Sequence, residues 1–251
     1  MKFSACVEWL FARESPDVAG RIRLAAEAGL DGVEFWHWRD KDIASIEAAL
    51  RATGLPLTGM VAEPMIALTD PANHAAFLAG LDASIACARR LGCHVLIAQT
   101  GDDLPGRPRA GQRAALAEGL RAAADRLAGT GVVLAVEPLN ILVDHPGYFL
   151  SSTLEGLDLV DEVARPEIGL LYDIYHSAVM GEEIAAVLAG RIDRVAHVHL
   201  AGHPGRNEPQ SGTMDWQERL SWLERNGYRG FVGLEYRPLG ATLAGLPVFP
   251  A

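Results

Sequence analysis

Four ionisable side chains stand at or near the ends of four consecutive apolar runs in the second half of the sequence. The runs contain Val-Glu-Pro-Leu-Asn, Tyr-Asp-Ile-Tyr-His, His-Val-His-Leu and Leu-Glu-Tyr-Arg-Pro, and the four side chains are Glu137, Asp173, His199 and Glu235. A charge in an apolar run is costly unless it is paired or bound to a metal ion. If the runs are adjacent strands, about 4.8 Å apart, the side chains converge and the carboxylates repel one another. A divalent cation removes that repulsion, so the pattern indicates a metal site.

The donor types indicate which metal this would be. Three carboxylates and one imidazole are mostly hard oxygen donors, which favours Mg²⁺ or Mn²⁺ over a structural zinc ion with cysteine ligands. The chain has three cysteines, Cys6, Cys87 and Cys93, and no CxxC pair. A cysteine-rich zinc site and a disulfide framework are therefore not expected, and a reducing cytoplasm is the expected location. Taken singly, each of the four side chains could be a surface charge or a packed core residue; the four together favour the metal.

Three further residues near these runs are candidates for supporting roles. His197 lies two residues before His199 and points to the same face of the run. We expect His199, nearer the end, to be the ligand and His197 to be a packed, hydrogen-bonded residue one layer deeper. His176, expected in a loop, and Arg206, in the Gly- and Pro-rich segment 202–209, are candidate substrate contacts. Arginine can bind a carboxylate through two parallel hydrogen bonds, but each of these residues could also be an ordinary loop or surface residue.

The elements that would position these residues are short β-rich runs that alternate with longer stretches of helical period. The expected strands are Lys2–Val7, Gly32–Trp36, Leu57–Ala62, Val95–Thr100, Val132–Pro138, Gly169–Ile174, Val195–Leu200 and Phe231–Tyr236. Helices are expected over 16–28, 41–53, 72–91, 109–128, 153–164, 181–189 and 215–226. Eight β-then-α units predict a parallel sheet that closes as a (β/α)8 TIM barrel of the α/β class. An open doubly wound sheet is the alternative, but no GxGxxG follows the first strand.

Length and charge limit the number of domains and the kinds of partner that the chain can have. The 251 residues fit one barrel domain over 1–251, and the tail Leu239–Ala251 is expected to pack against the barrel or a neighbouring subunit. The net charge of −10 argues against nucleic-acid partners and means that an anionic substrate needs a local cation. No apolar run is long enough to predict a membrane span or a signal peptide.

The chain resembles the xylose-isomerase-like TIM-barrel superfamily, and within it the hydroxypyruvate isomerase family. The four motifs carry this resemblance, together with Gly-Leu-Asp-Gly-Val-Glu-Phe-Trp and His-Pro-Gly-Tyr-Phe-Leu-Ser-Ser. The resemblance implies that Glu137 and Glu235 are both metal ligands and the acid/base pair. It also implies that Asp173 and His199 complete the ligand set, and that His176 and Arg206 contact the substrate.

Two positions complicate the choice of substrate. Some hydroxypyruvate isomerases carry Gln where this chain has His199, whereas the sugar epimerases of the superfamily carry His. Those epimerases have a further Glu six residues after the Glu of the fifth strand, and this chain has Val143 there. The His therefore keeps an epimerase in view, and the missing Glu argues against one.

The hypothesis from the sequence is a metal-dependent isomerase that interconverts hydroxypyruvate and tartronate semialdehyde through an enediolate. A ketose 3-epimerase or an inosose-type dehydratase on the same metal site is the main alternative, and its substrate would be a neutral sugar or cyclitol. An abasic-site endonuclease and a non-catalytic binding barrel are weaker alternatives. A homo-oligomer is an expectation from the family alone. Pocket roles for Trp9, Phe11, Trp36, Trp38 and Glu63 stay open, since each could equally be a core or loop residue.

Overall fold

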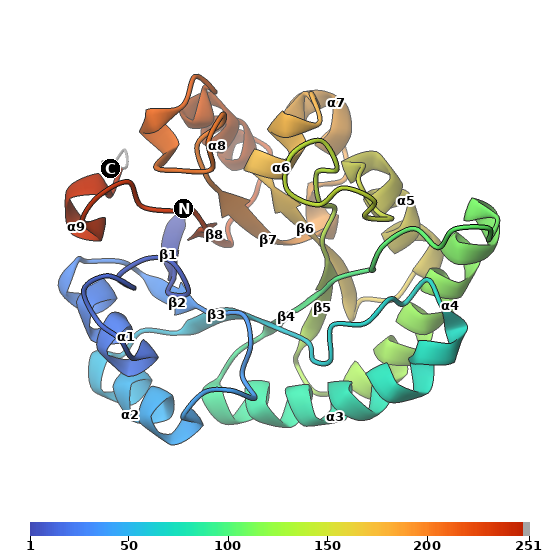
Figure 1. Cartoon of the computed structure of the whole chain (residues 1–251), viewed down its shortest axis with the longest axis horizontal. Helices are drawn as coiled ribbons and strands as arrows, with labels where there is room; N and C mark the ends of the chain where they lie inside the picture. The colour runs from blue at the N-terminus through green and yellow to red at the C-terminus, as the bar shows by residue number, and fades with distance from the viewer. Residues whose placement is uncertain (248–251) are drawn as a thin grey trace.

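The eight β-rich runs form a closed barrel of parallel strands in the computed structural model, which describes residues 1–247 (Figure 1). Each strand pairs with the next along the chain, and β8 pairs with β1 to close the barrel. The strands are β1 Lys2–Cys6, β2 Gly32–Glu34, β3 Leu57–Val61, β4 Val95–Ala98, β5 Val133–Val136, β6 Ile168–Asp173, β7 Val195–Leu200 and β8 Phe231–Leu234. The predicted TIM barrel is confirmed, while residues 248–251 of the expected single domain lie outside the described part.

Helices surround the barrel on its outer side (Figure 1). The α-helices are α1 Val18–Glu27, α2 Ile43–Thr53, α3 His74–Leu91, α4 Arg109–Leu127, α5 Thr153–Val163, α6 Ile174–Val179, α7 Ile184–Leu188, α8 Trp216–Arg225 and α9 Thr242–Gly245. Short 3₁₀ turns cover η1 Pro71–Asn73, η2 Ile192–Arg194 and η3 Pro209–Ser211. Within residues 1–247, no helix is both long and apolar enough to cross a membrane. All three cysteines are buried and unpaired.

The segment after β6 differs from the sequence prediction. We expected a loop around His176 and one helix over 181–189, but α6 begins immediately after the strand and α7 covers only Ile184–Leu188. The cause is Asp173, whose Oδ1 accepts hydrogen bonds from the backbone N–H groups of Tyr175 (2.7 Å) and His176 (3.1 Å). These bonds satisfy the first free N–H groups of a helix and so start one there. The placement of His176 in a loop was therefore wrong.

Most strands are shorter at their carboxyl ends than the apolar pattern predicts. Strand pairing in β2 stops at Glu34 rather than Trp36, and in β5 it stops at Val136 rather than Pro138. The residues that follow are buried or, like Trp36, half-buried, which is why the pattern continues through them. They turn away from the ladder and become the walls of the carboxyl-terminal end of the barrel, where the active sites of TIM barrels lie.

The chain beyond β8 packs back on the barrel. Thr242, in α9, is buried; its Oγ1 accepts a hydrogen bond from the backbone N–H of Phe11 (2.8 Å), and its own N–H donates to Glu14 (2.6 Å). The tail therefore lies against the segment that connects β1 to α1, as one of the two expectations stated. Its last residues, 248–251, lie outside the described part.

A buried polar layer crosses the barrel interior below its carboxyl-terminal end. Glu34, on β2, is 2% exposed and accepts hydrogen bonds from Ser4 on β1 (3.3 Å) and Thr58 on β3 (3.2 Å). Its Oε2 lies 2.8 Å from Nε2 of His197, on β7 across the barrel. A Cβ atom on Gly233 of β8 would lie 2.3 Å from Oε1 of this carboxylate. Glycine at 233 thus makes room for a carboxylate that bridges the barrel.

We predict that Gly233→Ala destabilises the protein by about 1–3 kcal/mol, because Glu34 is held by its partners and cannot swing away from the new methyl group. Chemical denaturation monitored by circular dichroism measures this. Gly240→Ala is the control, since a Cβ there meets nothing within 4 Å. Equal stabilities of the two variants would contradict this view of Gly233.

Candidate active site

The four residues singled out in the sequence come together at the carboxyl-terminal end of the barrel. Asp173 and His199 lie in β6 and β7, while Glu137 and Glu235 directly follow β5 and β8. One ligand atom from each can be chosen so that all four atoms lie within 4.8 Å of one another, and none of the four residues is more than 5% exposed. We call this set the cluster. Three buried carboxylates at this separation require positive charge near them.

The donor atoms of the cluster fit a divalent cation. Nδ1 of His199 is buried without a hydrogen-bond partner among the described residues, and it lies 3.5 Å from Oε1 of Glu137 and 3.6 Å from Oε2 of Glu235. A buried, unpaired ring nitrogen that faces two carboxylates is what a metal ligand looks like before the ion is added. Oδ1 of Asp173 is occupied by helix α6, so its Oδ2 is the oxygen left for the cluster.

Glu34 and His197 lie directly behind the cluster. Nε2 of His199 lies 3.1 Å from Oε1 of Glu34, the same carboxylate that contacts His197 through Oε2. His197 is buried and hydrogen-bonded one layer deeper, in agreement with the expectation from the sequence. Burial disfavours a charged imidazole, but the carboxylates of Glu235 and Glu34 outweigh burial and raise the pKa of His199 well above its ordinary value.

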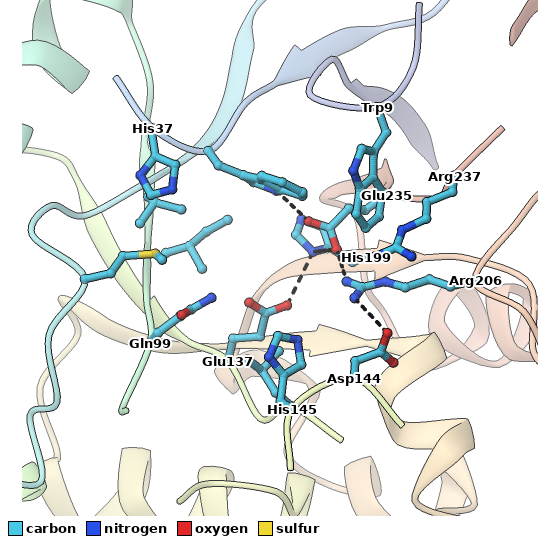
Figure 2. A pocket seen from close by; sticks show the side chains of 15 residues that line it. Trp9, His37, Gln99, Glu137, Asp144, His145, His199, Arg206, Glu235 and Arg237 are labelled. Atoms are coloured by element: carbon cyan, nitrogen blue, oxygen red, sulfur yellow. Dashed lines mark hydrogen bonds and ion pairs between the residues drawn. The ribbon is translucent and has the colours of Figure 1, made fainter. Parts of the chain in front are cut away.

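Both oxygens of Glu235 are held by cavity residues. Oε1 accepts a hydrogen bond from the indole Nε1 of Trp36 (2.8 Å), and Oε2 accepts one from Nη2 of Arg206 (2.7 Å). Nη1 of Arg206 lies 3.6 Å from Asp144. The two amino groups of this guanidinium therefore already face protein carboxylates, as Figure 2 shows. The bidentate grip on a substrate carboxylate expected from the sequence would have to displace one of them.

The backbone of Arg206 is held in an unusual conformation. Its φ angle is +54°, in the left-handed region that costs a non-glycine residue about 1–2 kcal/mol. Its N–H donates to the carbonyl of Gly202 (2.9 Å), and its carbonyl accepts from the N–H of Arg237 (2.9 Å). The guanidinium lies over the rings of Trp9 (5.0 Å) and Tyr175 (5.2 Å). Backbone strain of this kind is typical of residues held for function.

His176 lies beside the cluster but does not line the cavity. Its Nδ1 accepts a hydrogen bond from the backbone N–H of Asn140 (3.1 Å), so the ring proton is on Nε2. That Nε2 is buried without a hydrogen-bond partner among the described residues, 3.6 Å from Asp173. Burial and the charge of Arg206 lower the pKa of His176 to about 3, so the ring is neutral at physiological pH.

A cavity of about 430 Å³ opens above the cluster (Figure 2). Trp9 and Trp36 line it, which answers the question that the sequence left open for these two residues. Trp38, Phe11 and Glu63 are not among the lining residues: the Trp38 indole donates to Ser84, and Phe11 packs in the core. Glu63 instead contacts His37, Trp38 and Arg39.

The two halves of the barrel contribute differently to this cavity. The lining residues that carry a carboxylate or a guanidinium come after β4, and they are Glu137, Asp144, Arg206, Glu235 and Arg237. The first half supplies aromatic, apolar and neutral polar walls, such as Trp9, Trp36, Met65 and Gln99. The reacting groups and most of the opposite wall thus come from different segments of the chain.

Sequence reasoning missed three residues at this end of the barrel. Glu34 interrupts an apolar run as the cluster residues do, so the same signal could have found it. Asp144 and Arg237 lie outside the strands, where the apolar pattern gives no signal. Val143, the position considered in the sequence, is 62% exposed, whereas its neighbour Asp144 points into the cavity and accepts hydrogen bonds from Asn140 and Tyr175 (both 2.7 Å).

Comparison with known proteins identifies the class. Residues 22–248 match the model of the family described as xylose isomerase-like TIM barrel, and the chain belongs to that family. A crystal structure titled AP endonuclease, family 2, from Brucella melitensis is 33% identical, covers 98% of this chain and 96% of that one, and superposes with a TM-score of 0.91.

Relatives with named activities indicate which family within this superfamily the chain belongs to. Hydroxypyruvate isomerase of Escherichia coli strain K12 is 32% identical over 98% of this chain and 97% of its own length. A protein named 2-oxo-tetronate isomerase from Pectobacterium atrosepticum is 28% identical over 98% of this chain and 95% of its own length. The chain is an isomerase of the hydroxypyruvate isomerase family, and the resemblance seen in its motifs is confirmed.

We predict that the wild type binds one Mn²⁺ ion per chain and that His199→Ala weakens this binding about 100-fold or more. Loss of a residue that only supports a ligand costs about 10- to 100-fold, so loss of a ligand should cost at least as much. Isothermal titration calorimetry measures the affinity without reference to activity. His94→Ala is the control, because His94 precedes β4 at the opposite end of the barrel. Unchanged affinity in His199→Ala would remove His199 from the ligand set.

We also predict that metal binding releases a proton near neutral pH. The raised pKa of His199 keeps its imidazole protonated in the metal-free protein, and an imidazole must lose that proton to bind a metal. The affinity for Mn²⁺ should therefore rise with pH through the neutral range. Titration calorimetry at one pH in MOPS and in Tris detects the proton as a heat that depends on the buffer. A heat that is the same in both buffers would contradict this protonation state.

Proposed function

We propose that the protein interconverts hydroxypyruvate and tartronate semialdehyde with the help of a divalent ion, Mg²⁺ or Mn²⁺. The observation that carries the proposal is the placement of Glu137 and Glu235 within one buried cluster at the floor of a cavity that also holds arginines. Two carboxylates on either side of a small substrate can remove a proton from one carbon and return it to the next.

The reaction is a proton transfer with no net redox change. The C–H bond at carbon 3 of hydroxypyruvate breaks, a C–H bond forms at carbon 2, and a proton passes from the oxygen of carbon 3 to that of carbon 2. A divalent ion supplies Lewis-acid polarisation of the carbonyl oxygen when it is bound. Glu137 and Glu235 hold the moving proton, and the bonds from Trp36 and Arg206 fix the carboxylate of Glu235 in position.

Two residues near the cluster, His176 and Arg206, are the proposed substrate contacts. His176 does not line the cavity, so its proposed contact requires a substrate oxygen beside Asp173, where its Nε2–H has no hydrogen-bond partner among the described residues. Arg206 contacts the substrate on the side of Glu235, where its guanidinium lies over the rings of Trp9 and Tyr175. The names of the E. coli and P. atrosepticum relatives both describe isomerases that act on 2-oxo acids, which supports a substrate of this kind.

One observation favours a second candidate, a ketose epimerase or an inosose-type dehydratase on the same cluster. Asp144 brings a carboxylate into the cavity one residue beyond the position where the epimerases carry Glu. Burial raises the pKa of Asp144, but hydrogen bonds from Asn140 and Tyr175 outweigh burial and lower it, so this carboxylate is available to accept bonds from sugar hydroxyls. The net charge of −10 argues against nuclease activity on DNA, which needs a positive surface.

We predict that the protein with Mg²⁺ converts hydroxypyruvate to tartronate semialdehyde in D₂O, with solvent deuterium entering at carbon, as followed by proton NMR. Glu235→Gln should lower turnover at saturating Mg²⁺ by at least about 100-fold while leaving the fold intact, because proton transfer by a positioned group contributes about 10²–10⁴-fold. Glu118→Gln, an exposed change on α4, is the matched control.

Two outcomes would overturn the proposal. Turnover that persists in metal-loaded Glu235→Gln would exclude Glu235 from proton transfer. Absence of conversion by the metal-bound wild type would favour the neutral sugar or cyclitol substrate of the second candidate.

A further inference from the structure

Arg237 is a second guanidinium in the cavity. It follows β8 two residues after Glu235, and its side chain lines the same cavity as the cluster. The guanidinium carbons of Arg237 and Arg206 each lie 5.0 Å from the ring of Trp9. Figure 2 shows the two arginines reaching toward Glu235 from the same side. A single indole therefore supports both cations.

The two arginines differ in how their charges are balanced. Arg206 is 8% exposed, and its amino groups face Glu235 and Asp144. Arg237 is exposed and forms no salt bridge with any carboxylate of residues 1–247. Its side chain contacts Trp9, while its backbone bonds with Arg206 and Asn207. The charge of Arg237 thus faces the cavity without a carboxylate partner among the described residues.

The charges around the cavity indicate what the guanidinium of Arg237 could bind. The three carboxylates of the cluster, with those of Asp144 and of Glu34 behind it, outweigh a divalent ion and Arg206 by two negative charges when the histidines are uncharged. An anionic substrate would be repelled by such a site, because charges in a partly buried cavity are weakly screened. Arg237 offsets one of these negative charges and adds donors suited to a carboxylate.

The position of Arg237 is fixed despite its exposure. Its N–H donates to the carbonyl of Arg206 (2.9 Å), and its own carbonyl accepts from Nδ2 of Asn207 (2.8 Å). The end of β8 is therefore tied to the segment that follows β7. A guanidinium on such a backbone, stacked on an indole, loses little further freedom when it binds an anion.

We infer that Arg237 binds the carboxylate of the substrate and selects short 2-oxo acid anions over neutral ketoses, while Arg206 holds Glu235 at the reacting end. This inference rests on the proposed function, since it names the group that recognises the acid. Arg237 acts on specificity and takes no part in proton transfer.

The test compares an acid and a neutral ketone that offer the same reacting group, hydroxypyruvate and dihydroxyacetone. Arg237→Gln should lower kcat/KM for hydroxypyruvate by about 10- to 100-fold, mainly through KM, as expected for a lost charge-assisted hydrogen bond. The value for dihydroxyacetone should change by less than about 3-fold. Arg237→Lys should restore most of the loss, and Arg23→Gln, an exposed arginine on α1, is the matched control.

Equal losses for both substrates would show a structural role, and no loss for hydroxypyruvate would remove Arg237 from recognition; either result overturns the inference. A binding measurement separates this result from failure of the proposed function. Titration calorimetry of D-glycerate into the Mg²⁺-loaded protein should show binding at least about 10-fold weaker in Arg237→Gln than in wild type. A wild type that binds D-glycerate in this way but converts no hydroxypyruvate would overturn only the proposed function. Equal binding, or no binding by wild type, would overturn the inference itself.

Discussion

Repulsion between buried carboxylates is the constraint on which this end of the barrel depends. Two unit charges about 4 Å apart repel by about 4 kcal/mol even at the effective dielectric constant of a protein surface, and the cluster contains three carboxylates within about that range. Such a group is stable only with cations and hydrogen-bond donors around it. His199 and Arg206 supply positive charge, Trp36 supplies a donor, and the geometry leaves room for a divalent ion.

A fourth buried carboxylate, that of Glu34, lies deeper in the barrel and is subject to the same need for compensating partners. Glu34 lies between His197 and His199 and shares its two oxygens between them, so the imidazole nearest the cluster has a negative group behind it. That carboxylate needs space in a closed barrel, and Gly233 provides it. The glycine of β8, the glutamate of β2 and the histidines of β7 therefore form one unit. A change in any of them reaches the cluster without touching its carboxylates.

The sequence predicted the barrel and the cluster for one physical reason. Each cluster residue places a charge in an apolar run, and parallel strands with helical crossovers bring their carboxyl ends together. Other features depend on geometry that the pattern does not contain. In the sequence Asp173 ends a predicted strand, but in the structure it also caps a helix, so His176 lies in that helix and not in the expected loop. Asp144 and Arg237 lie outside the strands, where conformation rather than periodicity decides which side chains face inward.

The unequal contribution of the two half-barrels has a consequence for how such an enzyme can change. The carboxylates and guanidinium groups that line the cavity come from the second half, while the first half supplies walls such as Met65 and Gln99. Residues that shape the space for a substrate can therefore vary independently of those that move its proton. Divergence in nature, or a mutant library in the laboratory, can therefore change substrate choice through wall residues such as Met65 and Gln99 and leave the reacting groups unchanged. Trp36 and Glu34 are exceptions in the first half, because they contact Glu235 and His199.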